Sequence, residues 1–119
     1  MHEMAYIVDI IDTVCASAQK AGATKVKQIT LNIGAMRDFH QEYIDAYFTH
    51  FSKDTLAEGA EVIVNFIPAN VRCKCCGAVL PVDLTVKDDA PHCPDHPDSE
   101  VELVSGMELA VESIAISRK

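Results

Sequence analysis

The chain has 119 residues, a formal net charge of −8 at pH 7 and a pI near 4.9. This length suits one domain with a modest core, and 49% hydrophobic against 24% charged residues indicates a folded rather than a disordered chain. The acidic balance disfavours binding to nucleic-acid phosphates, and no apolar run is long enough to span a membrane. No signal peptide is recognisable, so we expect a soluble, cytoplasmic protein with reduced thiols.

The amino terminus, Met1-His2-Glu3, is a candidate metal chelate. The α-amine, the His2 amide nitrogen and His2 Nδ1 can close two adjoining chelate rings around one ion. This planar nitrogen set suits Ni(II) or Cu(II), which prefer square-planar or tetragonal geometry. Methionine aminopeptidases act mainly before small residues, so we expect Met1 and its amine to remain. Such a site is open on one side.

The first predicted element is an amphipathic helix over residues 4–21, because apolar side chains recur at helical spacing. These side chains are Met4, Ile7, Val8, Ile11, Val14, Cys15 and Ala18. Gly22 is expected to end the helix, and the charge of Glu3 complements its N-terminal dipole. Cys15 lies on the apolar stripe, so we interpret it as a core residue.

A half-buried strand is predicted over residues 25–33, where apolar and polar side chains alternate before Gly34. Asp38 followed by Gln41 resembles a capping box, which predicts a second helix running to about Lys53. The apolar stripe of this helix is Ile44, Tyr47, Phe48 and Phe51. His40 lies at the start of this helix, where it is either a solvated surface residue or, by approaching the amino terminus, a further metal donor.

The second half of the chain is predicted to be mainly β-structure. Residues 60–71 form one long predicted strand, with Pro68 at an edge or bend that could act as a hinge. Residues 79–85 predict a short hairpin. Residues 100–104 and 107–116 predict two strands joined by Ser105-Gly106, with a change of phase in the last strand that indicates a bulge.

Two metal-binding knuckles lie between these strands. Cys73 and Cys76 form the first pair, Cys93 and His96 form the second, and 16 residues separate the pairs. This spacing is typical of a zinc ribbon, in which tight turns direct both pairs at one tetrahedral ion. Four protein ligands close the coordination sphere, whereas a catalytic zinc keeps a position for water. We therefore expect a structural Zn(II) site.

Two alternatives to this ligand set remain open. Cys75 could replace Cys76 in a slipped register, although the C-x-x-C-G spacing favours Cys76, and His92 could replace His96. Disulfide formation is disfavoured for the reduced thiols expected here. The predicted fold is α+β, with two helices packed on a small mixed sheet. We expect residues 1–68 and 100–119 to form the nickel-binding body and residues 69–99 to form an inserted zinc-binding ribbon.

Taken together, the Met-His-Glu terminus, the helix, the strand ending in Ile33-Gly34, the second helix and the ribbon resemble the hydrogenase nickel-incorporation family HypA. The resemblance covers essentially the whole chain. It implies a nickel metallochaperone that works with a HypB-type GTPase and serves the large subunit of [NiFe]-hydrogenase or its maturation complex. In this family the amino terminus takes part in nickel binding and four ribbon residues hold structural zinc.

Carried onto this chain, the resemblance implies Ni(II) at Met1, His2 and Glu3 and Zn(II) at Cys73, Cys76 and Cys93. The fourth zinc ligand of the family is ordinarily cysteine, so His96 is a departure. Some family members also have an acidic side chain where His40 falls. A histidine there is either an added nickel donor or a surface change.

Two other functions were weighed against nickel delivery. In the first, the ribbon and acidic surfaces form a protein–protein adaptor and His2 is incidental. In the second, Cys15 or Cys75 is the nucleophile of an enzyme, but no Gly-rich phosphate loop, nucleophile elbow or acid–base pair accompanies them. We therefore expect no enzymatic activity, and we expect a partner to dock near the first helix on exposed Glu3, Asp9 or Asp12.

Overall fold

The computed structural model describes residues 2–86 and 90–118, with the backbone alone for His2. The chain forms two compact units, which are described separately. The first comprises Met1–Asn32, Phe39–Asn65 and Ala110–Lys119, and the second comprises Ile33–Asp38 and Phe66–Leu109. The second unit contains the expected ribbon segment, residues 69–99. That the ribbon and body behave as separate domains stays a prediction.

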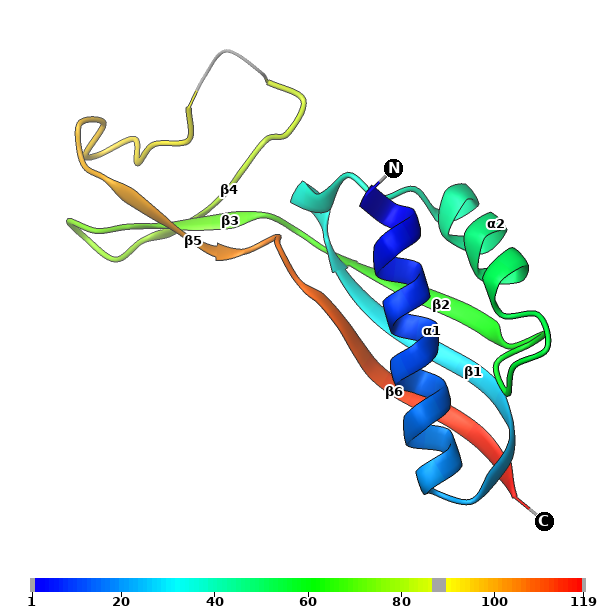
Figure 1. Ribbon diagram of the computed structural model, residues 1–119. Helices are drawn as coiled ribbons and strands as arrows, with labels where there is room; N and C mark the ends of the chain where they lie inside the picture. Colours follow the sequence, from blue (N-terminus) through cyan, green and yellow to red (C-terminus); the bar gives the residue numbers. More distant parts are fainter. Residues whose placement is uncertain (1, 87–89, 119) are drawn as a thin grey trace. The chain divides into compact units, whose positions relative to one another are not determined.

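The first unit packs two helices on one face of a three-stranded sheet (Figure 1). Helix α1 is His2–Lys20 and helix α2 is Gln41–Phe51. The strand order is β2-β1-β6, with β1 Ala23–Gly34 in the centre, β2 Glu61–Ile67 on one side and β6 Leu109–Arg118 on the other. The α+β class and both helices are therefore confirmed.

The core of this unit lies between the helices and the central strand. The predicted stripe of α1 is buried at four positions, and the alternating residues of β1 meet it. The buried side chains are Ile7, Ile11, Val14, Ala18, Val26, Ile29, Leu31, Ile44, Phe48 and Ala57. Of the other three positions on the predicted stripe, Val8 and Cys15 are half-buried, and Met4 is 42% exposed. Burying such a set supplies the main driving force for folding.

Hydrogen-bonded polar side chains lie on the other face of this sheet. Asn65 on β2 donates hydrogen bonds to Asn32 on β1 at 3.1 Å and to Glu112 on β6 at 3.3 Å. Gln28 on β1 donates to Glu61 on β2 at 2.6 Å. Because side chains alternate between the two faces of a strand, one face can pack on the helices while the other meets water.

The second unit contains a smaller sheet of order β4-β3-β5. Strand β3 is Asn70–Cys73, β4 is Val79–Pro81 and β5 is Val101–Ser105, and β3 pairs antiparallel with both neighbours. The register places Val71 opposite Leu80 on one side and Leu103 on the other, with a shift between Asn70 and Val71. Thus β3 brings Cys73 to the end of the sheet.

Two details of the predicted elements are wrong. The predicted strand 60–71 is two strands, β2 and β3, because Pro68 lacks the N–H that a continuous ladder requires. The hairpin expected within residues 79–85 instead joins β3 to β4. The two predicted closing strands are confirmed as β5 and β6; they belong to different sheets, and Gly106, at φ 119°, lies between them.

The expected capping box at Asp38 is also wrong. Asp38 has a left-handed backbone (φ 57°) and ends the short 3-10 helix η1, Ala35–Arg37. His40 is the N-cap of α2, and its own side chain makes no capping hydrogen bond. Asp38 therefore cannot cap α2, because an N-cap residue adopts an extended backbone at the boundary of the helix.

A close backbone crossing explains why a glycine ends β1. A Cβ atom built on Gly34 would overlap the Gly106 carbonyl and the Met107 nitrogen. The Gly34 amide donates to the Glu108 carbonyl at 2.7 Å, and the Met36 amide donates to the Gly106 carbonyl at 2.9 Å. Since Gly34 has an ordinary backbone (φ −68°, ψ 141°), the requirement for glycine here is steric.

We predict that Gly34→Ala destabilises the protein by at least about 1–3 kcal/mol, because the new methyl group meets fixed backbone atoms. Gly22→Ala is the matched control: Gly22 has φ 77° but open space around its Cβ position, so only backbone strain of about 1–2 kcal/mol is expected. Urea unfolding followed by circular dichroism measures both. A larger loss of unfolding free energy in Gly22→Ala than in Gly34→Ala would contradict the close backbone crossing.

Candidate metal sites

Four of the predicted ligands converge at one end of the second unit. The sulfur atoms of Cys73, Cys76 and Cys93 and a ring nitrogen of His96 all lie within 4.8 Å of one another. The Cys76 and Cys93 sulfurs are 3.8 Å apart, and Cys93 Sγ lies 3.7 Å from His96 Nδ1. The four residues expected from spacing alone are therefore brought together.

Two tight turns position these side chains. After β3, the Gly77 amide donates to the Cys73 carbonyl at 2.8 Å and the Cys73 amide donates to the Ala78 carbonyl at 2.9 Å, with Gly77 at φ 76°. In the second turn, the His96 amide donates to the Cys93 carbonyl at 3.1 Å. Each turn directs its two ligands to the same side, as a two-residue spacer permits.

The cluster has the dimensions of a tetrahedral metal site. With metal–sulfur bonds of about 2.3 Å, tetrahedral geometry places two thiolate sulfurs about 3.8 Å apart. The separation of Cys76 and Cys93 agrees with this value. Cys73 and Cys93 are buried at 0% and 1% exposure, whereas Cys76 is exposed. The residues present therefore fit a metal ion that favours thiolate and imidazole ligands.

The two cysteines of the first knuckle ionise differently. The Cys76 amide, assisted by the Ser99 side chain and the Cys75 amide, lowers the pKa of Cys73 to about 6, although burial opposes this change. The Ala78 amide lowers the pKa of Cys76, but burial, the Cys73 and Cys93 thiols and the Cys73 charge outweigh it and raise the pKa overall. At neutral pH, Cys73 is thus a ready thiolate, while Cys76 must lose a proton when a cation binds.

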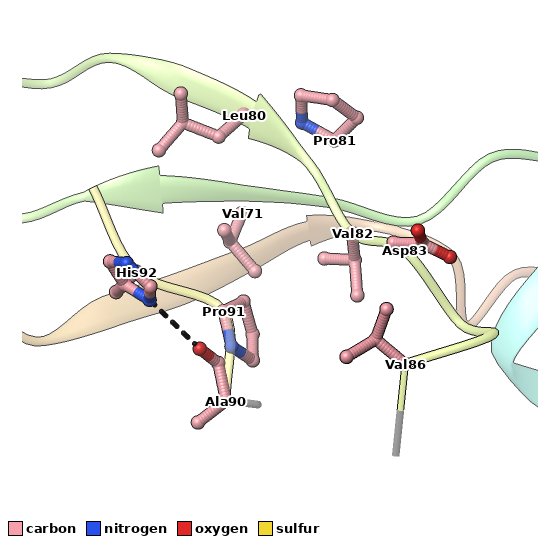
Figure 2. A pocket seen from close by; sticks show the side chains of 9 residues that line it. All are labelled: Val71, Leu80, Pro81, Val82, Asp83, Val86, Ala90, Pro91 and His92. Atoms are coloured by element: carbon pink, nitrogen blue, oxygen red, sulfur yellow. Dashed lines mark hydrogen bonds between the residues drawn. The ribbon is translucent and has the colours of Figure 1, made fainter. Parts of the chain in front are cut away.

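The two alternative ligands lie outside this cluster. Cys75 is exposed, and His92 Nδ1 lies 3.1 Å from the Ala90 carbonyl oxygen. His92 lines a hollow of about 300 Å³ with the apolar residues Val71, Leu80, Val82 and Val86 (Figure 2). Asp83, also on its wall, accepts hydrogen bonds from the Thr85 amide at 2.9 Å and hydroxyl at 2.6 Å. Figure 2 places this carboxylate across the hollow from His92, so the two do not form an acid–base pair.

The second candidate site is the amino terminus. Met1 lies outside the described residues, as does the side chain of His2. Glu3 is described, and its side chain is buried at 9% exposure. The expectation that Glu3 is an exposed docking residue is therefore wrong. Asp9 and Asp12 on the same helix are exposed, as expected.

Glu3 is buried because its carboxylate caps the second helix. Glu3 Oε1 accepts a hydrogen bond from the backbone N–H of His40, the N-cap of α2, at 3.1 Å. Glu3 also lies in the first turn of α1, so one negative charge serves the positive ends of two helix dipoles. This bond places the backbone of His40 beside the first turn of α1, as expected for a further donor near the terminus.

Two aromatic ring contacts lie next to the hydrogen bond between Glu3 and His40. The rings of Tyr6 and Phe39 lie 5.9 Å apart, and the imidazole of His40 meets the Tyr43 ring edge-on at 5.8 Å. Phe39 is 8% exposed, while His40 is exposed. Sequence reasoning missed the capping role of Glu3, because capping patterns are recognised only when both residues are close in sequence. Here 37 positions separate them.

Known proteins resemble this chain over its whole length. The family model "Hydrogenase/urease nickel incorporation, metallochaperone, hypA" matches residues 1–116. The chain belongs to the HypA family. It is 34% identical over 116 residues to the hydrogenase maturation factor HypA of Chlorobaculum parvum, covering 98% of this chain and 99% of that protein. It is 32% identical to HypA of Dehalococcoides mccartyi over 98% of this chain and 94% of that protein.

Solved structures of the family share the fold. The solution structure of the Ni metallochaperone HypA from Helicobacter pylori covers 98% of both chains with a TM-score of 0.66 at 19% identity. A second structure, titled "Solution structure of HypA protein", covers 100% of this chain and 98% of its own, with a TM-score of 0.73 at 20% identity. Among the described residues of the present HypA-family chain, no helix has the length and apolar character needed to cross a lipid bilayer.

We predict that Glu3→Ala lowers the free energy of unfolding by about 1–2 kcal/mol, because α2 loses its capping acceptor. Glu3→Gln should retain most of the stability, since an amide oxygen can accept the same hydrogen bond. Glu42→Ala is the control, because Glu42 lies in the first turn of α2 but is exposed. If urea unfolding gives equal losses for Glu3→Ala and Glu42→Ala, the cap is not important for stability.

Proposed function

We propose that this chain is a nickel metallochaperone of [NiFe]-hydrogenase maturation that binds Ni(II) at its amino terminus and carries structural Zn(II) in its second unit. The observation that carries the proposal is the family match over residues 1–116, which includes the chelating terminus Met1-His2-Glu3. The family description names nickel incorporation for hydrogenase and urease. We propose [NiFe]-hydrogenase as the recipient of the nickel because the relatives are named as hydrogenase maturation factors.

The proposed nickel donors are the Met1 amine, the His2 amide and the His2 imidazole. Helix α1 begins at His2, and the first N–H groups of a helix have no intrahelical acceptor. A metal therefore takes the His2 nitrogen without breaking a helical hydrogen bond. Because the Glu3 carboxylate accepts a hydrogen bond from His40, Glu3 would either donate its backbone nitrogen to the metal or only hold the terminus in place. The His40 imidazole would supply a further donor.

The proposed zinc ligands are Cys73, Cys76, Cys93 and His96. Their mutual distances suit a tetrahedral ion, and three thiolates with one imidazole form an ordinary zinc set. When bound, the zinc would hold the two knuckles together without a position for substrate. Metal binding of this kind is coupled to local folding. We infer that residues 69–99 depend on zinc for their order, whereas the body formed by residues 1–68 and 100–119 does not.

A carrier needs a recipient that can reach the open side of the nickel chelate. We infer that a HypB-type GTPase docks near α1, and that the chain then serves the hydrogenase large subunit or its maturation complex in the cytoplasm. Exposed Asp9 and Asp12 offer the charges for this contact. The carrier acts without catalysis of its own. The competing adaptor hypothesis predicts the same docking without nickel binding.

The zinc assignment predicts different effects for two neighbouring histidines. His96→Ala should lower zinc content and increase protease cleavage within residues 73–96, because the ion loses its fourth ligand. The helical circular dichroism signal of the body should change little. His92→Ala is the matched control and should retain zinc, since His92 lies outside the ligand cluster. Zinc loss in His92→Ala but not in His96→Ala would reverse the assignment.

The nickel assignment depends on a free terminus. Isothermal titration should find one nickel site in the native-terminus protein and little binding in His2→Ala or in a protein with one added N-terminal residue. The added residue converts the Met1 amine into an amide and removes a donor while every side chain remains. Binding should also weaken in acid, because the amine and imidazole, with reference pKa values of about 7.7–8.0 and 6.5, must lose protons.

Zinc content serves as the control in this titration and should be the same in all three proteins. Native nickel affinity in both altered proteins would exclude the terminal chelate. The nickel donors would then have to be sought at His40 or in the cysteine cluster. An intact terminus that binds no nickel at all would favour the adaptor hypothesis.

The docking proposal predicts that Asp9→Lys with Asp12→Lys weakens binding to a HypB-type GTPase. The loss should be greater at low ionic strength, because contacts between exposed charges are screened by salt. Glu61→Lys, which reverses an exposed charge on β2, is the control and should leave binding unchanged. Surface plasmon resonance at two salt concentrations measures the effect. Unchanged binding by the double variant would place the interface elsewhere.

A further inference from the structure

The four candidate zinc ligands differ in their access to solvent. Cys73 and Cys93 are buried at 0% and 1% exposure, and His96 is partly covered. Cys76 is exposed. Cys76 is therefore the most solvent-exposed residue of the four. Oxidation of cysteine by peroxides follows exposure and thiolate character, and zinc binding would hold Cys76 in the thiolate form.

Cys76 also has a resolving partner in place. Its sulfur lies 3.8 Å from the sulfur of Cys93, although 17 positions separate the two residues. Cys76 belongs to the turn after β3, and Cys93 belongs to the opposite knuckle, at an isolated bridge with His96. An exposed cysteine next to a second cysteine is the arrangement found in redox-sensitive sites.

We propose that Cys76 is an oxidation site at which hydrogen peroxide forms a Cys76–Cys93 disulfide and thereby releases the zinc. The inference rests on the zinc part of the proposed function. The Cys76 thiolate attacks one peroxide oxygen, so that an S–O bond forms, the O–O bond breaks and hydroxide leaves. The Cys93 thiolate then attacks the Cys76 sulfur, which forms the S–S bond and expels a second hydroxide.

The electron balance of this reaction is complete. The two thiolates lose two electrons, and the peroxide gains them as two hydroxide ions, which the buffer protonates to water. Zinc loses two of its four ligands, because neither disulfide sulfur remains a thiolate donor. Cys73 and His96 alone do not provide the closed tetrahedral set of a structural site. A thiol reductant such as dithiothreitol reverses the reaction and restores the site.

Two competing disulfides are less favoured. Cys75 is exposed but lies outside the ligand cluster, and a bond between adjacent Cys75 and Cys76 would strain the peptide between them. Cys73 lies within 4.8 Å of the other ligands and shares a C-x-x-C spacing with Cys76, and it is as buried as Cys93, so burial does not separate these two partners. The observed contact between sulfurs of the two knuckles favours Cys93 as the partner.

The experiment treats zinc-loaded, full-length protein with hydrogen peroxide, blocks the remaining thiols and digests with trypsin for mass spectrometry. Cleavage after Arg72, Lys74 and Lys87 separates the cysteines into peptides 73–74, 75–87 and 88–118. A Cys76–Cys93 disulfide links peptide 75–87 to peptide 88–118. A Cys73–Cys76 disulfide instead links 73–74 to 75–87, and a Cys75–Cys76 disulfide stays within 75–87.

We expect the 75–87 to 88–118 link to accumulate in step with zinc release, which a chromogenic chelator measures, and both to reverse with dithiothreitol. Cys75→Ser should behave as the wild type, which identifies Cys76 as the linked residue. A predominant 73–74 link, loss of the cross-link in Cys75→Ser, or zinc release without the cross-link would overturn the inference. Zinc measured before oxidation separates the two failures: its absence refutes the zinc proposal, while its presence without the cross-link refutes only the oxidation site.

Discussion

A single buried carboxylate joins the starts of the two helices of this protein. Glu3 accepts the backbone hydrogen bond of His40 and thereby joins the first turn of α1 to the start of α2. A charged acceptor serving a helix terminus contributes more than an exposed ion pair, because both helix dipoles and burial strengthen it. The proposed nickel donors precede Glu3 directly in sequence, and the candidate extra donor belongs to the same residue as the bonded N–H, His40.

The two candidate metal sites differ in the way their functions require. The terminal set offers nitrogen donors and an open side, which suits an ion that must be given up to a partner. The cluster in the second unit offers three sulfurs and one imidazole around a closed position, which suits an ion that stays. Thiolates prefer softer metals, so donor chemistry would direct the two proposed ions to different sites.

The sequence was informative where local rules apply and misleading where distant backbone segments meet. Helical spacing predicted α1, and the C-x-x-C and C-x-x-H spacing predicted which four side chains converge. The capping role of Glu3 could not be predicted, because its partner lies 37 positions away. Likewise, the sequence marks Gly34 as the end of a strand. The reason that a glycine is required there is the close approach of Gly106, which lies far along the chain. The split at Pro68 was expected only as a bend.

In the proposed function, nitrogen donors at the terminus hold nickel and the cysteine cluster does not. X-ray absorption at the nickel edge distinguishes these two sites, using native-terminus protein that already contains zinc and has received one equivalent of nickel. We expect a nickel shell of nitrogen and oxygen atoms alone, with the zinc edge still reporting sulfur neighbours. Sulfur in the nickel shell would instead place nickel among Cys73, Cys76 and Cys93 and exclude the terminal site.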